Sequence, residues 1–186
     1  MLAVILVANY KFSLKTYGND SDRFAEITES LIDMDEESFK RTYKELNPNR
    51  CIFEKSITNR RCDCQLKRKF VIATRECVAC QSEIAMARCT RVLDSLRNNA
   101  RFSLKVITVN GPMPHNKELQ VQAGGMLALQ NLMTSMPDLE LKSVVNIHQT
   151  METALEKYGS TEDLPYGELV KGIVKYESRP KRKKKK

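Results

Sequence analysis

Apolar residues recur every three or four positions along most of this chain, a spacing that places them on one face of a helix. Ser82 is a suitable N-cap for one such helix, and Gly159 is a suitable stop for another. Stretches with continuous or alternating apolar residues predict strands instead. The predicted helices are residues 20–32, 36–46, 82–100, 117–135, 144–158 and 165–176, and the predicted strands are residues 2–12 and 102–106.

The first of these strands is the longest apolar run, from Met1 to Ala8. A helix that crosses a bilayer needs about 20 apolar residues, so this run is too short to span one. It also lacks the basic residues and the cleavage site of a secretory signal. We therefore expect a buried strand at this end of the chain.

Two adjacent glycines, Gly124 and Gly125, lie inside the predicted helix 117–135. Each glycine in a helix interior costs up to about 1 kcal/mol relative to alanine. The pair therefore predicts either a kink in the helix or a close approach of another backbone.

The formal charge of +8 is concentrated at one end of the chain. Residues 179–186 carry seven of the 31 basic residues and no acidic ones, which leaves 24 basic against 23 acidic residues elsewhere. Such a cationic arm repels itself and is expected to be disordered. It can contact RNA, anionic lipid or an acidic protein, and a purely solubilising role is equally compatible with its composition.

All six cysteines lie within 39 residues, in the spacing C-x10-C-x-C-x12-C-x2-C-x8-C. They are Cys51, Cys62, Cys64, Cys77, Cys80 and Cys89. Thiolates are preferred ligands of zinc and of iron–sulfur clusters, and short spacings let neighbouring sulfurs converge on one centre. Cys89 shares a helix face with apolar residues, so we expect it to point inward.

The irregular spacing favours an iron–sulfur cluster, a 4Fe-4S cluster in particular, and zinc is the alternative. The cationic run Lys67, Arg68 and Lys69 is suited to offset the negative charge of a thiolate-bound centre. Disulfides and unrelated buried thiols remain open, although the lack of an export signal disfavours disulfides.

These patterns predict an α+β fold that is mainly helical, with a cysteine-rich loop region packed on a helix by a metal or iron–sulfur centre. The expected organisation is an N-terminal strand with acidic helices, a cysteine-bearing core domain, C-terminal helices and a disordered basic tail. Their respective boundaries are residues 1–46, 47–135, 136–178 and 179–186.

Several of these motifs carry a resemblance to a known family. They are residues 49–56 (Asn-Arg-Cys-Ile-Phe-Glu-Lys-Ser), Cys62-Asp63-Cys64, Val78-Ala79-Cys80, Cys89, residues 114–118 (Pro-His-Asn-Lys-Glu) and residues 122–125 (Gln-Ala-Gly-Gly). Over about residues 47–133 the chain resembles a small cysteine-bearing family of proteobacteria. That family is similar to an accessory subunit of mitochondrial respiratory complex I found in many protists.

The resemblance implies a ligand set for the centre. It favours Cys51, Cys80, Cys89 and one of Cys62 and Cys64, and it leaves Cys77 outside the set. The family often has a further cysteine before the glycine pair, where this chain has Ala123. A ligand at that position is therefore lost or replaced here.

Taken together, the sequence predicts a non-catalytic metal-binding accessory subunit that joins protein subunits of a larger complex. If the resemblance holds, that complex is complex I, on the matrix side of the mitochondrial inner membrane, and the centre is structural or transfers electrons; otherwise the protein is cytoplasmic. One alternative is a zinc protein that binds RNA or the ribosome through the basic tail. The other is a thiol oxidoreductase that uses Cys77 and Cys80.

Overall fold

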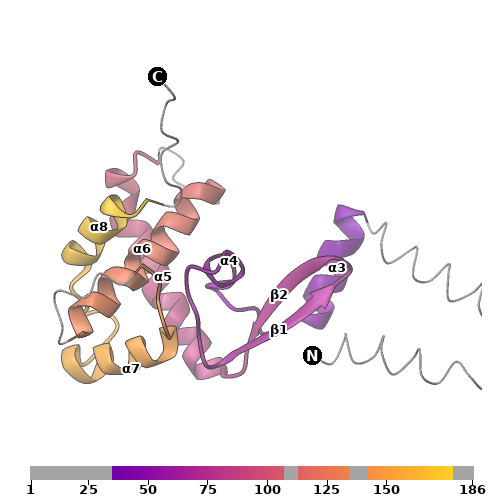
Figure 1. Cartoon of the computed structure of the whole chain (residues 1–186), viewed down its shortest axis with the longest axis horizontal. Helices are drawn as coiled ribbons and strands as arrows, with labels where there is room; N and C mark the ends of the chain where they lie inside the picture. Colours follow the sequence, from indigo (N-terminus) through magenta and orange to yellow (C-terminus); the bar gives the residue numbers. More distant parts are fainter. Residues whose placement is uncertain (1–34, 107–112, 135–141, 178–186) are drawn as a thin grey trace, which may run out of the picture. The chain divides into compact units, whose positions relative to one another are not determined.

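A computed structural model of the chain describes residues 35–106, 113–134 and 142–177 (Figure 1). The chain divides into two compact units, one of Met1–Cys51 with Lys67–Gln81 and one of Ile52–Leu66 with Ser82–Lys186. The region predicted as a cysteine-bearing core domain, residues 47–135, therefore contributes to both units. The strand predicted at 2–12, the helix predicted at 20–32 and the basic tail lie outside the described residues.

The described part of the first unit consists of helix α3 and an antiparallel pair of strands, β1 and β2 (Figure 1). α3 spans Glu36–Leu46, as predicted, and the Asp35 side chain caps it by accepting a 2.7 Å hydrogen bond from the Ser38 N–H. β1 spans Lys67–Ile72 and β2 spans Arg75–Cys80. Part of the region expected as a cysteine-rich loop is therefore a hairpin, and the expectation was wrong in this respect.

The hairpin has a turn that local sequence does not signal. Ala73 and Thr74 connect the two strands, and Ala73 has a φ of +52°. Glycine and asparagine adopt this left-handed conformation at low cost, and an Asn-Gly pair is the usual mark of a two-residue hairpin turn. Because the turn contains neither glycine nor asparagine, the sequence of this segment indicates a loop and not a hairpin.

The second unit contains five helices among its described residues. They are α4 (Glu54–Thr58), α5 (Glu83–Ser103), α6 (His115–Met133), α7 (Ile147–Tyr158) and α8 (Tyr166–Lys175). α6 packs against each of the other four (Figure 1), and buried residues lie around most of its circumference. Such a distribution is typical of a central helix. The described chain is thus mainly helical with one small sheet, which confirms the α+β prediction.

The strand predicted at residues 102–106 is wrong, because α5 continues to Ser103. The helix ends in a Schellman motif, in which the N–H of Val106 donates to the Arg101 carbonyl at 3.0 Å and the N–H of Lys105 donates to the Phe102 carbonyl at 3.0 Å. Phe102 is 94% exposed. The alternation of apolar residues therefore did not mark a buried strand face.

The glycine pair produces a close helix approach, which confirms one of its two predicted roles. A Cβ atom at Gly124 would lie 2.8 Å from the Cβ of Tyr176 and 3.0 Å from the Cα of Ile173. A Cβ atom at Gly125 would lie 2.8 Å from a methyl group of Leu96. Both distances are too short for real carbon atoms, so α6 needs glycine where α8 and α5 cross it.

Two glutamines of α6 fasten irregular segments to this central helix. The buried Gln122 accepts a hydrogen bond from the Ser56 N–H at 3.1 Å and donates to the Ile52 carbonyl at 3.1 Å. Gln130 donates to the Ser143 carbonyl at 3.2 Å and accepts from the Val145 N–H at 2.8 Å. Buried backbone N–H and C=O groups need hydrogen-bond partners, so the two glutamines stabilise the irregular segments near Cys62 and Val144.

Candidate metal centre

The segment before α4 lies as a third extended segment along the two-stranded hairpin of the first unit, joined to it by one isolated bridge. The N–H of Cys51 donates to the Val78 carbonyl at 3.0 Å, and the N–H of Cys80 donates to the Asn49 carbonyl at 2.7 Å. Arg50 and Ala79 are directly opposite each other in an antiparallel bridge. Residues 49–51 therefore run along the edge of β2 that β1 does not occupy.

This register puts Cys51 and Cys80 on one face of the three-stranded arrangement. Cys51 is opposite Val78, and successive residues of a strand point to alternate faces, so Cys80 shares the face of Val78. Cys51 and Cys80 are then diagonal neighbours on adjacent strands, with Cα atoms roughly 7–8 Å apart. Cysteine side chains from such positions reach a common metal ion, where two thiolates bonded at about 2.3 Å lie within about 4 Å of each other.

Cys77 points to the opposite face, which α3 covers. Arg75, on the same face as Cys77, lies with its guanidinium 4.3 Å from the centre of the Phe39 ring and pairs with Glu36 at 2.8 Å. Cys77 is 1% exposed. It is therefore a core residue of this unit.

The strand conformation of β2 also argues against a redox pair of Cys77 and Cys80. Three residues of extended chain separate their Cα atoms by roughly 10 Å, and the two side chains point to opposite faces. A disulfide requires Cα atoms less than about 7 Å apart. The C-x2-C spacing thus gives no disulfide in this conformation.

Lysines of β1 border the face that carries the two cysteines. Lys67 is directly opposite Cys80, and Lys69 is opposite Val78. Lys69 also pairs with Glu76 at 2.5 Å, and both side chains are about 40% exposed. A metal centre with several thiolate ligands carries negative charge, and the ammonium group of Lys67 lies on the side of the sheet where it offsets such a charge.

The second unit contains Cys62, Cys64 and Cys89, and Cys62 is more deeply buried than the other two. Cys62 is 5% exposed and pairs with Val144 in a parallel bridge. Burial raises the pKa of the Cys62 thiol to about 12, against the smaller opposing effect of a hydrogen bond with Ser56. In the absence of a metal ion this thiol therefore keeps its proton at neutral pH.

Cys64 and Cys89 are half-buried, so both are more accessible than Cys62. Cys89 was expected to point inward; it lies on α5 one turn after the buried Ala85, but it keeps partial exposure. The two alternative ligands Cys62 and Cys64 therefore differ in accessibility, and Cys64 is the more accessible.

The described residues build a pair of thiols but not a complete ligand set. Across residues 35–106, 113–134 and 142–177, no group of three or more His, Cys, Asp or Glu side chains is close enough to hold a metal ion. All six cysteines are thiols there, and none is part of a disulfide. Cys51 and Cys80 therefore fit two positions of a centre, and further ligands are needed to complete it.

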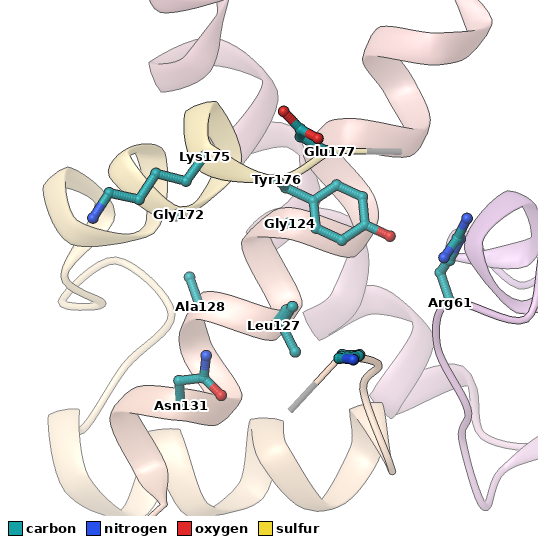
Figure 2. Close-up of a pocket in the computed structure, with 10 residues that line it drawn as sticks. Arg61, Gly124, Leu127, Ala128, Asn131, Gly172, Lys175, Tyr176 and Glu177 are labelled. Atoms are coloured by element: carbon teal, nitrogen blue, oxygen red, sulfur yellow. The ribbon is translucent and has the colours of Figure 1, made fainter. Parts of the chain in front are cut away.

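A second feature of the second unit is a pocket between α6, α8 and the segment of Arg61, which Figure 2 shows. Its polar residues, among them Arg61, Asn131 and Tyr176, come from distant parts of the sequence. No local motif connects these residues, and sequence reasoning missed them.

Comparison with known proteins finds no matching family model, no matching curated protein and no matching solved structure. Within the described ranges, none of the helices combines the length and the apolar character that a bilayer span needs. The resemblance noted in the sequence remains a prediction.

Proposed function

We propose that this protein is a non-catalytic, metal-binding accessory protein whose cysteines hold an iron–sulfur cluster, with zinc as the alternative. The observation that carries the proposal is the pairing of residues 49–51 with β2. This pairing brings Cys51 and Cys80 onto one face although they are 29 positions apart in the sequence. Two thiols held by strand hydrogen bonds form a rigid half of a ligand set.

The electrostatics of this face support thiolate ligation. Four thiolates around a metal centre carry a net negative charge, and nearby cations offset it. Lys67, directly opposite Cys80, provides such a cation, whereas the charge of Lys69 is paired with that of Glu76. Cys77 lies on the opposite face and is 1% exposed.

The proposed ligands beyond this pair come from the remaining thiols. Cys77 is buried on the covered face, and Cys62 is buried with a strongly raised pKa. By the resemblance, the remaining ligands are Cys89 and one of Cys62 and Cys64, of which Cys64 is the more accessible.

The accessory role rests on the resemblance described for residues 47–133. By that resemblance the larger complex is respiratory complex I, with this protein on its matrix side and the centre in a structural or electron-transferring role.

Metal analysis of single cysteine variants tests the proposal. The full chain is purified anaerobically, and its iron, zinc and inorganic sulfide contents and its visible spectrum are measured. Cys51→Ser and Cys80→Ser are expected to lose most of the bound metal. Cys77→Ser, a change of the same size in the same strand as Cys80, is the matched control and should keep it.

A second pair of variants tests the assignment in the other unit. Cys64→Ser should lower the metal content, whereas Cys62→Ser should leave it unchanged. Far-UV circular dichroism of each variant shows whether its fold is intact. Full metal content in folded Cys51→Ser and Cys80→Ser, or no iron or zinc in the parent protein, would overturn the proposal.

A further inference from the structure

The pocket of the second unit has the size and shape of a small-molecule site. Its volume is about 510 Å³, within the usual range of about 300–1,000 Å³ for ligand pockets. The pocket lies wholly within this unit, with α6 and the end of α8 on one side and Arg61 on the other (Figure 2). Leu127 and Ala128 provide part of an apolar wall.

Glycines shape this pocket by letting α8 lie directly on α6. Gly124 and Gly172 both line it, and a Cβ atom at Gly172 would overlap that of Ala128. The missing side chains bring the end of α8 close to α6, which fixes the Tyr176 ring beside Gly124, as Figure 2 shows. The pocket is therefore built by rigid helix packing.

The charges of the lining favour an anion. Three cationic residues, Arg61, Lys142 and Lys175, line the pocket together with one carboxylate, that of Glu177, so the net charge is +2. In Figure 2 the Lys175 side chain points away from the Tyr176 hydroxyl, so its ammonium acts from the rim. The arginine guanidinium is the group best suited to hold phosphate or carboxylate oxygens through two hydrogen bonds.

The Tyr176 hydroxyl provides an independent sign of a missing ligand. Its oxygen is buried and has no hydrogen-bond partner among the described residues. Figure 2 shows the ring reaching into the pocket with this oxygen on the side of Arg61. A buried hydroxyl without a partner is unfavourable by about 1–3 kcal/mol, and such groups in native proteins usually meet a water or an ion.

The hydroxyl is a donor at neutral pH. Burial raises the pKa of Tyr176, and this effect outweighs the opposing influence of the Arg61 charge. The phenol therefore keeps its proton and can donate it to an acceptor oxygen beside the guanidinium.

We propose that this pocket binds a small organic anion, whose phosphate or carboxylate group lies between Arg61 and the hydroxyl of Tyr176. The apolar wall of Leu127 and Ala128 contacts the uncharged part of the ligand. None of the cysteines lines the pocket.

Titrations followed by amide NMR test the proposal on the full chain. Inorganic phosphate and acetate are the two probes, each added at constant ionic strength with chloride as the reference anion. We expect saturable shifts at Gly124, Gly172 and the Asn131 side chain. Tighter binding of phosphate assigns the ligand to phosphorylated compounds, and tighter binding of acetate assigns it to carboxylates.

Three variants locate the binding. Arg61→Gln should weaken the binding of the preferred anion about tenfold, as should Tyr176→Phe, which retains the ring and removes only the hydroxyl. Arg60→Gln removes the same charge from the neighbouring exposed residue, which does not line the pocket, and should change the dissociation constant by less than twofold. Thermal melting confirms that each variant is folded.

The absence of saturable shifts with both anions would overturn the proposal. Equal losses in Arg60→Gln and Arg61→Gln would also overturn it, because they would mean that only the overall charge attracts the anion. Unchanged binding by folded Tyr176→Phe would contradict the role given to the hydroxyl.

Discussion

Replacing Gly172 by alanine should destabilise the second unit, although alanine is the better helix former. In the middle of a helix the change from glycine to alanine gains about 1 kcal/mol. Here, however, the new methyl group would overlap the Cβ of Ala128 and lie 3.6 Å from the Gly124 carbonyl oxygen. Neither neighbour is the end of a flexible side chain, so α6 and α8 must separate.

The magnitude follows from these opposing effects. Overpacking of a rigid contact costs about 1–3 kcal/mol, and the 2.4 Å approach to the Cβ of Ala128, which moves only with the α6 backbone, puts Gly172 at the upper end of that range. After the gain in helix propensity, we expect a net loss of about 2 kcal/mol in the free energy of unfolding. Gly167→Ala is the control in the same helix, because no atom lies within 4 Å of its added Cβ. It should be neutral or stabilising by up to about 1 kcal/mol.

Urea unfolding followed by circular dichroism measures both effects. A double-mutant cycle then tests the cause, because Ala128→Gly removes the atom that the new methyl group would strike. The double variant should be more stable than the sum of the single effects by at least about 1 kcal/mol. A Gly172→Ala protein as stable as Gly167→Ala, or a cycle without coupling, would show that the α6–α8 contact is not as close as described.

Three further predictions concern pH and one helix end. The folded pKa of Cys62, about 12, is above the value of 9.0 for an unperturbed thiol, so the contribution of this thiol to stability is complete below pH 9 and is lost as the pH rises toward 12. Urea unfolding between pH 8 and 11 should show this loss of stability. The Cys62→Ala variant should be less stable at pH 8 and should lose less stability over the same pH range. For Glu118, burial would raise the pKa, but hydrogen bonds from Arg97 and Gln122 outweigh it and lower the pKa below 4.5. The contribution of Glu118 to stability is therefore present above pH 4.5 and lost as the pH falls through the lowered pKa. Glu118→Gln should cost about 1.5–3 kcal/mol at pH 7 and should reduce the loss of stability at acid pH. An unchanged loss of stability at acid pH would contradict the role given to Glu118. Lys105 ends α5 with a φ of +55°, so Lys105→Gly should stabilise the protein by about 1 kcal/mol in thermal or urea unfolding, and a loss of stability would argue against the Schellman motif.

Most helices of the described chain were predictable from the sequence because their signals are local. Ser82 caps α5 through a 3.2 Å hydrogen bond to the Ala85 N–H, a contact between residues three positions apart. Gly159 ends α7 with a φ of +88°, a conformation that glycine adopts more readily than other residues. Both signals depend only on neighbouring residues, so the bounds of these helices follow closely from the sequence.

Local patterns were less reliable where tertiary packing outweighs them. The alternation at residues 102–106 resembled a strand, yet Phe102 lies exposed on the last turn of α5. The hairpin of β1 and β2 has no turn signal at Ala73, and its formation depends on cross-strand hydrogen bonds. A sequence does not reveal such partners unless the turn itself specifies them.

The sequence by itself determined that all six thiols lie in one segment, from Cys51 to Cys89. Only the tertiary structure decided their individual surroundings. Pairing of residues 49–51 with β2 places Cys51 and Cys80 on one face, while α3 buries Cys77 on the other and the second unit buries Cys62. The physical reason is that the chemistry of a thiol depends on solvent and nearby charge, and these come from residues remote in the sequence.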